Sequence, residues 1–144
     1  MAAPTVFVDT SFWIALFNQR DRNHVRARAW KKHCAGNRWA LVTSEQVLWE
    51  WLNASAALVS REAAAQGYAG CQADPRIEIV PVERSRTAEA VALYAARRDK
   101  TWSLTDCVSF RIMEERAMRS ALTADRDFQQ AGFQALLLEE PAES

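Results

Sequence analysis

Three aspartates lie where strand-like sequence gives way to helix-like sequence. Asp9 ends an apolar run at residues 5–8, Asp106 stands in the helix-opening segment 103–106, and Asp125 follows an apolar run at residues 120–123. Asp is common in turns and helix caps, because its side-chain oxygen accepts backbone N–H groups. If these segments were neighbouring strands and helix starts of one sheet, however, the same three carboxylates would meet in one pocket.

A pocket of several carboxylates favours a bound cation. Like charges at close range resist ionising together unless a positive charge neutralises them. Oxygen ligands without histidine suit Mg²⁺ or Mn²⁺ rather than zinc, and we interpret the only two histidines, His24 and His33, as surface residues of a basic segment. Such an ion can activate water and offset phosphate charge. We therefore expect Asp9, Asp106 and Asp125 to bind metal.

Other polar residues near these acids are candidates for auxiliary roles. Thr10 and Ser11 follow Asp9 directly, so their hydroxyls could bond ligand oxygens or cap the next helix. Asp127 comes two residues after Asp125 and could join the site, or it could stabilise a helix start through the macrodipole.

Glu45 and Glu50 both lie at the margin of the apolar stripe of one amphipathic segment. Periodicity alone leaves open which of the two glutamates faces the site.

Short apolar runs alternate with helical patterns along the whole chain. We expect strands at residues 5–8, 39–42, 77–82, 120–123 and 133–138. We expect helices at residues 12–17, 21–33, 47–58, 61–71, 87–98, 104–118 and 125–131. This order predicts a three-layer α/β/α fold with a mainly parallel central sheet. In such sheets ligands bind at the carboxyl ends of the strands.

Local patterns predict caps and buried faces. A capping box is expected at Thr43 and Gln46, because a Thr followed three residues later by Gln is typical of a helix start. In the helix at 21–33 the inward residues are predicted to be Val25, Ala29 and Trp30. In the helix at 87–98 they are predicted to be Ala88, Val91, Ala92 and Ala95.

Length and composition predict one domain. The chain has 144 residues with 18 basic and 18 acidic side chains, and we expect a single domain over 1–144, with an ordered core of about 1–139 and a short acidic tail. Three widely spaced cysteines are expected to be reduced and buried. The longest apolar stretch, 90–96, is too short for a membrane helix, and residues 1–8 do not resemble a leader, so we expect a cytoplasmic protein.

Four motifs in this order resemble the PIN-domain ribonucleases, and among them the VapC-type toxins of toxin–antitoxin pairs. They are VFVDTS at 6–11, TSEQVLWEWL at 43–52, SLTD at 103–106 and LTADRDF at 122–128. The resemblance spans nearly the whole chain and implies a PIN-like fold. It implies catalytic roles for Asp9, Glu50, Asp106 and Asp125, with Glu50 favoured because it precedes the apolar pair Trp51-Leu52.

The resemblance also implies an activity and partners. It implies an endoribonuclease dependent on Mg²⁺ or Mn²⁺, an RNA substrate, a homodimer and a small antitoxin. The antitoxin is expected near residues 12–17, since Phe12, Trp13, Leu16 and Phe17 cover most of the circumference of a short helix. The basic segment 20–38 follows it, with Asp21 as its single acid.

The residues leave other functions open. A haloacid dehalogenase-type phosphotransferase needs a second Asp where Ser11 stands, and a receiver domain needs an Asp on a middle strand, where residues 77–82 contain only Glu78. A housekeeping RNA-processing nuclease would use the same acids. A non-catalytic PIN-like binding module would use them only as caps, and a metal titration separates it from a nuclease.

Overall fold

The centre of the computed structural model, which describes residues 3–56 and 61–142, is a five-stranded parallel sheet of order β3-β2-β1-β4-β5. The strands are β1 Thr5–Val8, β2 Ala40–Ser44, β3 Ile77–Val80, β4 Ser120–Leu122 and β5 Gln134–Ala135. Every strand pairing is parallel, which confirms the predicted sheet.

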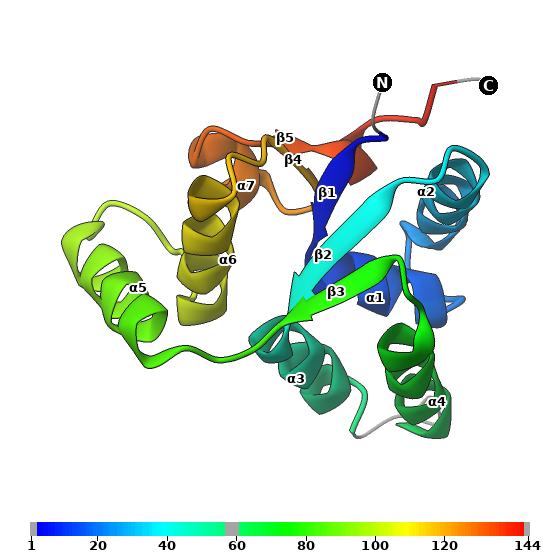
Figure 1. Ribbon diagram of the computed structural model, residues 1–144, viewed down its shortest axis with the longest axis horizontal. Helices are drawn as coiled ribbons and strands as arrows, with labels where there is room; N and C mark the ends of the chain where they lie inside the picture. Colours follow the sequence, from blue (N-terminus) through cyan, green and yellow to red (C-terminus); the bar gives the residue numbers. More distant parts are fainter. Residues whose placement is uncertain (1–2, 57–60, 143–144) are drawn as a thin grey trace.

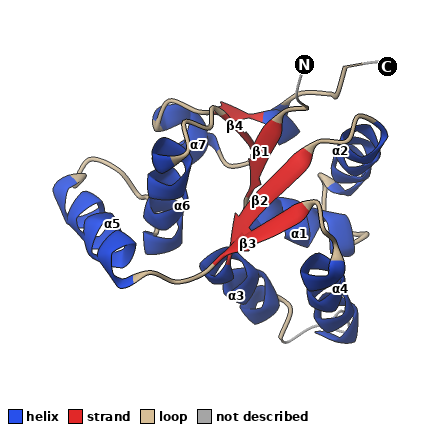
Figure 2. Cartoon of the chain, in the orientation of Figure 1, coloured by secondary structure: helices blue, strands red, loops and turns tan. Residues whose placement is uncertain are grey.

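Helices cover both faces of the sheet and its carboxyl edge. They are α1 Thr10–Phe17, α2 His24–Gly36, α3 Glu45–Ala54, α4 Arg61–Ala73, α5 Arg84–Ala96, α6 Leu104–Glu115 and α7 Arg126–Gln130. Figure 1 and Figure 2 show α6 and α7 on one side of the sheet and α1, α2 and α4 on the other. Helix α3 contacts both α1 and α6, so it joins the two helical layers. The predicted three-layer architecture is confirmed.

The core runs continuously through both layers. Phe7, Trp51 and Leu122 have no solvent exposure, and the ring of Phe110 packs edge-on against Phe128 with centroids 5.0 Å apart. The central strand β1 is buried on both faces over Val6, Phe7 and Val8, so its sequence there is apolar rather than alternating. This rigid centre holds the strand ends in fixed relative positions.

The pairing of β1 with β4 positions the carboxyl edge. Phe7 lies beside Ala121 and Val8 beside Leu122, and the backbone N–H of Asp9 donates to Leu122 O at 3.1 Å. The residues that follow the two strands, Asp9 and Thr123, therefore leave the sheet side by side.

The starts of helices α1 and α3 differ from the predicted ones. Helix α1 begins at Thr10, so Thr10 and Ser11 lie in its first turn and neither caps it. Helix α3 is capped by Ser44, whose hydroxyl accepts the Val47 N–H at 3.1 Å, whereas the Thr43 hydroxyl donates to Val8 O at 2.9 Å. The predicted capping box at Thr43 is therefore wrong by one residue.

Some predicted elements are shorter in the structure. Helix α3 ends at Ala54 and is followed by a turn at Ser55 and Ala56, so its predicted continuation is wrong at these two residues, while residues 57 and 58 lie outside the described part of the chain. The strand predicted at 133–138 is only two residues long and is followed by a 3-10 helix at Leu136–Leu138. A short apolar run such as this one fits a strand and a buried helical turn equally well.

The buried face of α2 differs in part from the predicted one. Trp30 is buried as predicted, together with Ala27 and Cys34, but Val25 is 80% exposed. The helix starts at His24 rather than at Asp21, because the Asp21 carboxylate accepts the Asn23 N–H at 2.8 Å in the preceding turn.

The predicted inward face of α5 is wrong. Its inward residues are Arg86 and Ala90, while the predicted set, Ala88, Val91, Ala92 and Ala95, faces solvent. In an alanine-rich helix the faces differ little in hydrophobicity, and here ion pairs accompany the packing. Arg86 is 8% exposed and donates to the carboxylates of Glu115 and Glu83 at 3.0 and 3.3 Å.

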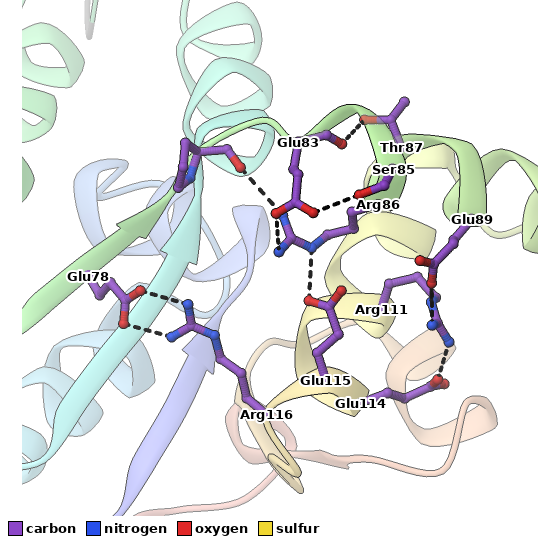
Figure 3. Close-up of polar contacts among 11 residues, drawn as sticks. Glu78, Glu83, Ser85, Arg86, Thr87, Glu89, Arg111, Glu114, Glu115 and Arg116 are labelled. Carbon is purple, nitrogen blue, oxygen red and sulfur yellow. Dashed lines mark hydrogen bonds and ion pairs between the residues drawn. The ribbon is translucent and has the colours of Figure 1, made fainter.

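Further ion pairs join this part of the molecule, as Figure 3 shows. Arg111 of α6 pairs with Glu89 of α5. Arg116 forms two hydrogen bonds of 2.7 Å with the carboxylate of Glu78 on β3. Helix α5 packs on α6 and stands at the edge of the molecule, away from the sheet (Figure 1).

The described cysteines and helices agree with two further predictions. Cys34, Cys71 and Cys107 are free and buried, and burial raises the pKa of Cys34 and of Cys71 to about 11. Thiols of such high pKa are inert near neutral pH. Among the helices of residues 3–56 and 61–142, none is long and apolar enough to cross a membrane.

Candidate functional site

Carboxylates gather at the carboxyl edge of the sheet. Asp106, Asp125 and Asp127 each offer an oxygen atom, and these atoms lie within 4.8 Å of one another. Asp9 is close enough for its charge to raise the pKa of Asp106. The fold thus brings together acids from the end of β1, the first turn of α6 and the segment after β4.

Helix capping holds two of these carboxylates in place. The Asp106 N–H donates to Ser103 Oγ at 3.0 Å, and the Ser103 N–H donates back to Asp106 Oδ2 at 3.2 Å. Asp125 caps α7 by accepting the Asp127 N–H on its Oδ1 at 2.8 Å. Both acids therefore have ordinary cap roles. In each of them one carboxylate oxygen accepts a backbone N–H.

Two hydroxyl groups hold Asp9, which is only 3% exposed. Thr123 Oγ1 donates to Asp9 Oδ2 at 2.8 Å, and Ser11 Oγ donates to the same oxygen at 3.1 Å. Thr123 is fully buried and was not singled out in the sequence. Its position beside Asp9 follows from the β1–β4 register, which the sequence pattern does not determine.

Burial and mutual repulsion make these carboxylates hard to ionise. Burial raises the pKa of Asp9 to about 6, although the Thr123 hydroxyl, the Thr10 backbone amide and the Ser11 hydroxyl oppose the rise. Burial, followed by the charge of Asp9, raises the pKa of Asp106 to about 7. Burial and the charge of Asp125 also raise the pKa of Asp127. A cation among these groups would favour their ionised forms.

The donor set fits a hard divalent cation. The clustered ligand atoms are all carboxylate oxygens, the type that Mg²⁺ and Mn²⁺ prefer. Asp127, expected only as an auxiliary residue, belongs to this cluster together with Asp125. Either can therefore contribute an oxygen.

The two auxiliary hydroxyls next to Asp9 differ in their contacts. Ser11 Oγ donates to Asp9 Oδ2 and also accepts the Ala124 N–H at 3.1 Å. Thr10 Oγ1 is buried and has no hydrogen-bond partner in the part of the chain that the structure describes. Thr10 thus keeps a polar group available next to the carboxylates.

The two glutamates of α3 also differ. Glu45 Oε1 accepts the backbone N–H of Val82 at 2.9 Å, which directs it to the segment after β3. Glu50 is half-buried and takes part in none of the hydrogen bonds or ion pairs among the described residues. Its membership of the site stays a prediction.

Comparison with known proteins agrees with this geometry. Residues 6–134 match the model of the PIN domain. The chain is 33% identical over 130 residues to the 23S rRNA-specific endonuclease VapC20 of Mycobacterium tuberculosis, an alignment that covers 89% of this chain and 95% of VapC20.

Solved structures show the same fold. The crystal structure of M. tuberculosis VapC20, described as a sarcin–ricin loop cleaving toxin, superposes with a TM-score of 0.79 at 28% identity, over 89% of this chain and 95% of that one. VapBC2 from Rickettsia felis, bound to a DNA fragment of its promoter, superposes with a TM-score of 0.66 at 13% identity, over 91% and 96% of the two chains. Since the family model covers most of the chain and VapC20 is similar along almost its full length, the chain belongs to the PIN-domain family.

Proposed function

We propose that this protein is an endoribonuclease dependent on Mg²⁺ or Mn²⁺, and the toxin of a toxin–antitoxin pair. The observation that carries the nuclease assignment is the carboxylate cluster of Asp106, Asp125 and Asp127 beside Asp9, in a chain of the PIN-domain family. The similarity to VapC20 supports the toxin assignment.

Asp9, Asp106 and Asp125 would hold the metal ion, with Asp127 as an adjacent ligand. The ion would supply an activated water and positive charge at the phosphate. The protein's own part is to fix these carboxylates through the Thr123, Ser11 and Ser103 contacts. Glu50 would accept a proton from the attacking water.

The substrate we propose is a structured ribosomal RNA. VapC20 is a 23S rRNA-specific endonuclease, and its structure is described as that of a sarcin–ricin loop cleaving toxin. The similarity over 89% of this chain makes an RNA oligonucleotide of that loop the first substrate to test. An enzyme acting on ribosomal RNA would work in the cytoplasm.

The cleavage experiment uses this oligonucleotide with Mg²⁺, with Mn²⁺ and with EDTA. We expect cleavage with either ion and none in EDTA. Asp106→Asn should reduce the rate at least about 100-fold, because loss of a metal-fixing charge removes the activated water. Asp99→Asn is the matched control, because Asp99 is an exposed loop acid paired with Arg97. Equal cleavage in EDTA would contradict the metal mechanism.

The proposed antitoxin site keeps only the second half of the predicted segment 12–17, together with the basic helix that follows it. Phe12 and Trp13 cannot anchor a partner, because they are 1% and 3% exposed and Trp13 stacks on Trp51 at 5.6 Å. Leu16 and Phe17, at the end of α1, instead line a groove of about 510 Å³ between α1 and α2.

The opposite wall of this groove is basic. It carries Arg28, Lys31 and Lys32 of α2, and none of the ion pairs found among the described residues involves them. Charge complementarity therefore favours an acidic antitoxin segment that places an apolar side chain against Leu16 and Phe17.

The test is co-expression with the product of the adjacent reading frame. A small protein from that frame should form a complex, and Lys31→Glu combined with Lys32→Glu should weaken it about 10-fold or more. Arg84→Glu, an exposed cation on α5, should leave binding unchanged. If expression of the protein alone were harmless and no complex formed, the toxin assignment would be wrong, and a housekeeping nuclease would take its place.

A further inference from the structure

The two oxygens of the Asp9 carboxylate have different surroundings. Both hydroxyl contacts, from Thr123 at 2.8 Å and from Ser11 at 3.1 Å, end on Oδ2. Neither hydroxyl contacts Oδ1. This asymmetry is built by the fold, since Thr123 and Ser11 are separated by 112 positions in sequence and meet only through the pairing of β1 with β4.

Backbone amides set the direction of both hydroxyl hydrogens. Thr123 Oγ1 accepts the Asp125 N–H at 3.0 Å, and Ser11 Oγ accepts the Ala124 N–H at 3.1 Å. A hydroxyl group has a single hydrogen. When a lone pair of its oxygen accepts an N–H group, the hydroxyl hydrogen is directed toward a different acceptor. For Thr123 the acceptor is Asp9 Oδ2, and for Ser11 it is Asp9 Oδ2 or Thr123 Oγ1.

The same hydroxyl joins two acids of the site. Thr123 bonds Asp9 through its hydrogen and the Asp125 backbone through its lone pair. The distance between Asp9, at the end of β1, and Asp125, after β4, is therefore set through one fully buried side chain.

We propose that Thr123, assisted by Ser11, is a positioning residue for metal binding: it occupies Asp9 Oδ2, so that Asp9 Oδ1 is left to bind the ion, and it holds the Asp125 backbone through the same hydroxyl. This inference rests on the proposed function, because it assigns a role within the same metal site. Partners that orient metal ligands typically contribute 10- to 100-fold to metal affinity, which is about the size expected here.

A neighbouring threonine provides a matched control. Thr43 lies on β2, is as fully buried as Thr123, and donates its hydroxyl to a backbone carbonyl, Val8 O, at 2.9 Å rather than to a carboxylate. Substitution by valine keeps the shape at either site and removes the buried hydrogen bonds of the hydroxyl, which join Thr123 to Asp9 and Asp125, and Thr43 to Val8 O and Trp13 Nε1. Both valine variants should lose stability, but only the one at residue 123 should lose metal affinity.

The experiment is calorimetric titration of the full chain with Mn²⁺ alone, with thermal unfolding in EDTA measured in parallel. We expect Thr123→Val to weaken Mn²⁺ binding about 10-fold or more, Thr123→Ser to restore most of the affinity, and Thr43→Val to bind Mn²⁺ as the wild type does. Ser11→Ala should cause a smaller loss, because Thr123 remains on Asp9 Oδ2.

The outcomes separate this inference from the proposed function. If the wild type binds Mn²⁺ and Thr123→Val binds it equally well, the positioning role is wrong while the metal site stands. If Thr43→Val weakens binding as much as Thr123→Val does, the effect is a general loss of a buried hydrogen bond and the positioning role is again wrong. A wild type that binds neither Mn²⁺ nor Mg²⁺ contradicts the proposed metal-dependent function itself.

Discussion

At the scale of single residues, structural and chemical roles coincide in the same side chains. Asp106 completes a capping box with Ser103 and also belongs to the carboxylate cluster. Asp125 caps α7 and belongs to the same cluster. A cap role is therefore no argument against a metal role. A capping hydrogen bond fixes the carboxylate in the orientation that a bound ion requires, as partners of metal ligands commonly do.

The two glutamates of α3 give a direct test of the site. Glu45 already binds the Val82 N–H, whereas Glu50 forms no hydrogen bond among the described residues. We expect Glu50→Gln to lower the RNA cleavage rate about 100-fold, the lower range for loss of a general base, and Glu45→Gln to lower it only slightly. The measurement is single-turnover cleavage with saturating Mg²⁺. A larger loss for Glu45→Gln would show that the assignment is reversed.

The raised pKa values predict how stability depends on pH without metal. Asp106 has a folded pKa of about 7 against an ordinary value of 3.8, so the folded protein holds this proton more tightly than the unfolded chain. The contribution of Asp106 to the free energy of unfolding is therefore largest below about pH 4 and falls as the pH rises toward 7. Between pH 5.5 and 7.5 the loss should reach up to about 2 kcal/mol for this group alone.

Thermal unfolding in EDTA checks this expectation. The wild type should lose stability from pH 5.5 to 7.5, and Asp106→Asn should lose less, since the amide does not ionise and still accepts the Ser103 N–H. Added Mn²⁺ should restore wild-type stability at pH 7.5, because a ligand that binds only the folded state stabilises it. An equal pH dependence in wild type and Asp106→Asn would show that Asp106 ionises normally.

At the scale of elements, patterns with strong local causes were predicted well. The alternation of strands and helices and the helix start predicted at residues 103–106 are confirmed. The inward face of α5 was wrong because alanine gives almost no contrast between faces, so packing on α6 and the buried Arg86 decide it. The cap of α3 differs by one residue because Thr43 and Ser44 are equally good caps by type, and only the contact of the Thr43 hydroxyl with Val8 O distinguishes them.

The close approach of α4 to α1 and α3 depends on one glycine. A Cβ atom at Gly67 would lie 2.7 Å from a ring atom of Trp51 and 2.8 Å from one of Phe17. Trp51 has no solvent exposure and so has little room to move. We expect Gly67→Ala to destabilise the protein by about 1–3 kcal/mol, the usual range for overpacking.

Gly70 on the same helix is the matched control. Its Cβ would meet nothing within 4 Å, so Gly70→Ala should stabilise the protein by about 0.5–1 kcal/mol through helix propensity. Urea unfolding of both variants gives the comparison. If both substitutions changed stability in the same direction, steric contact at Gly67 would not explain the difference between them.

At the scale of the whole molecule, topology made the site predictable in outline. The acids after two strand ends, Asp9 and Asp125, had to leave the sheet at one edge once the sheet was parallel, and the charge of each raises the pKa of Asp106. The role of Thr123 could not be predicted from the sequence, because threonine is not by itself typical of a functional site. Its role arises from the β1–β4 register, which places it beside Asp9 and depends on the packing of the whole sheet.

The exposed apolar side chains indicate which surface would form the predicted homodimer. Of the six most exposed large apolar side chains among the described residues, five lie on α3, α5, the segment between β3 and α5, and the start of α6. They are Trp49, Val82, Val91, Tyr94 and Leu104. The sixth is Val25, on α2. Clustered apolar exposure is typical of interaction surfaces, whereas a single exposed apolar residue is ordinary.

We therefore expect the homodimer to form through the outer face of α5. Val91→Asp should convert the dimer to a monomer, because a charge placed in an apolar interface loses its hydration without gaining a partner. Val25→Asp is the control, since Val25 is more exposed, at 80% against 47%, but lies on α2. Light scattering of the two variants and the wild type gives the masses. A monomeric wild type would contradict the dimer, and dissociation by Val25→Asp alone would move the interface to α2.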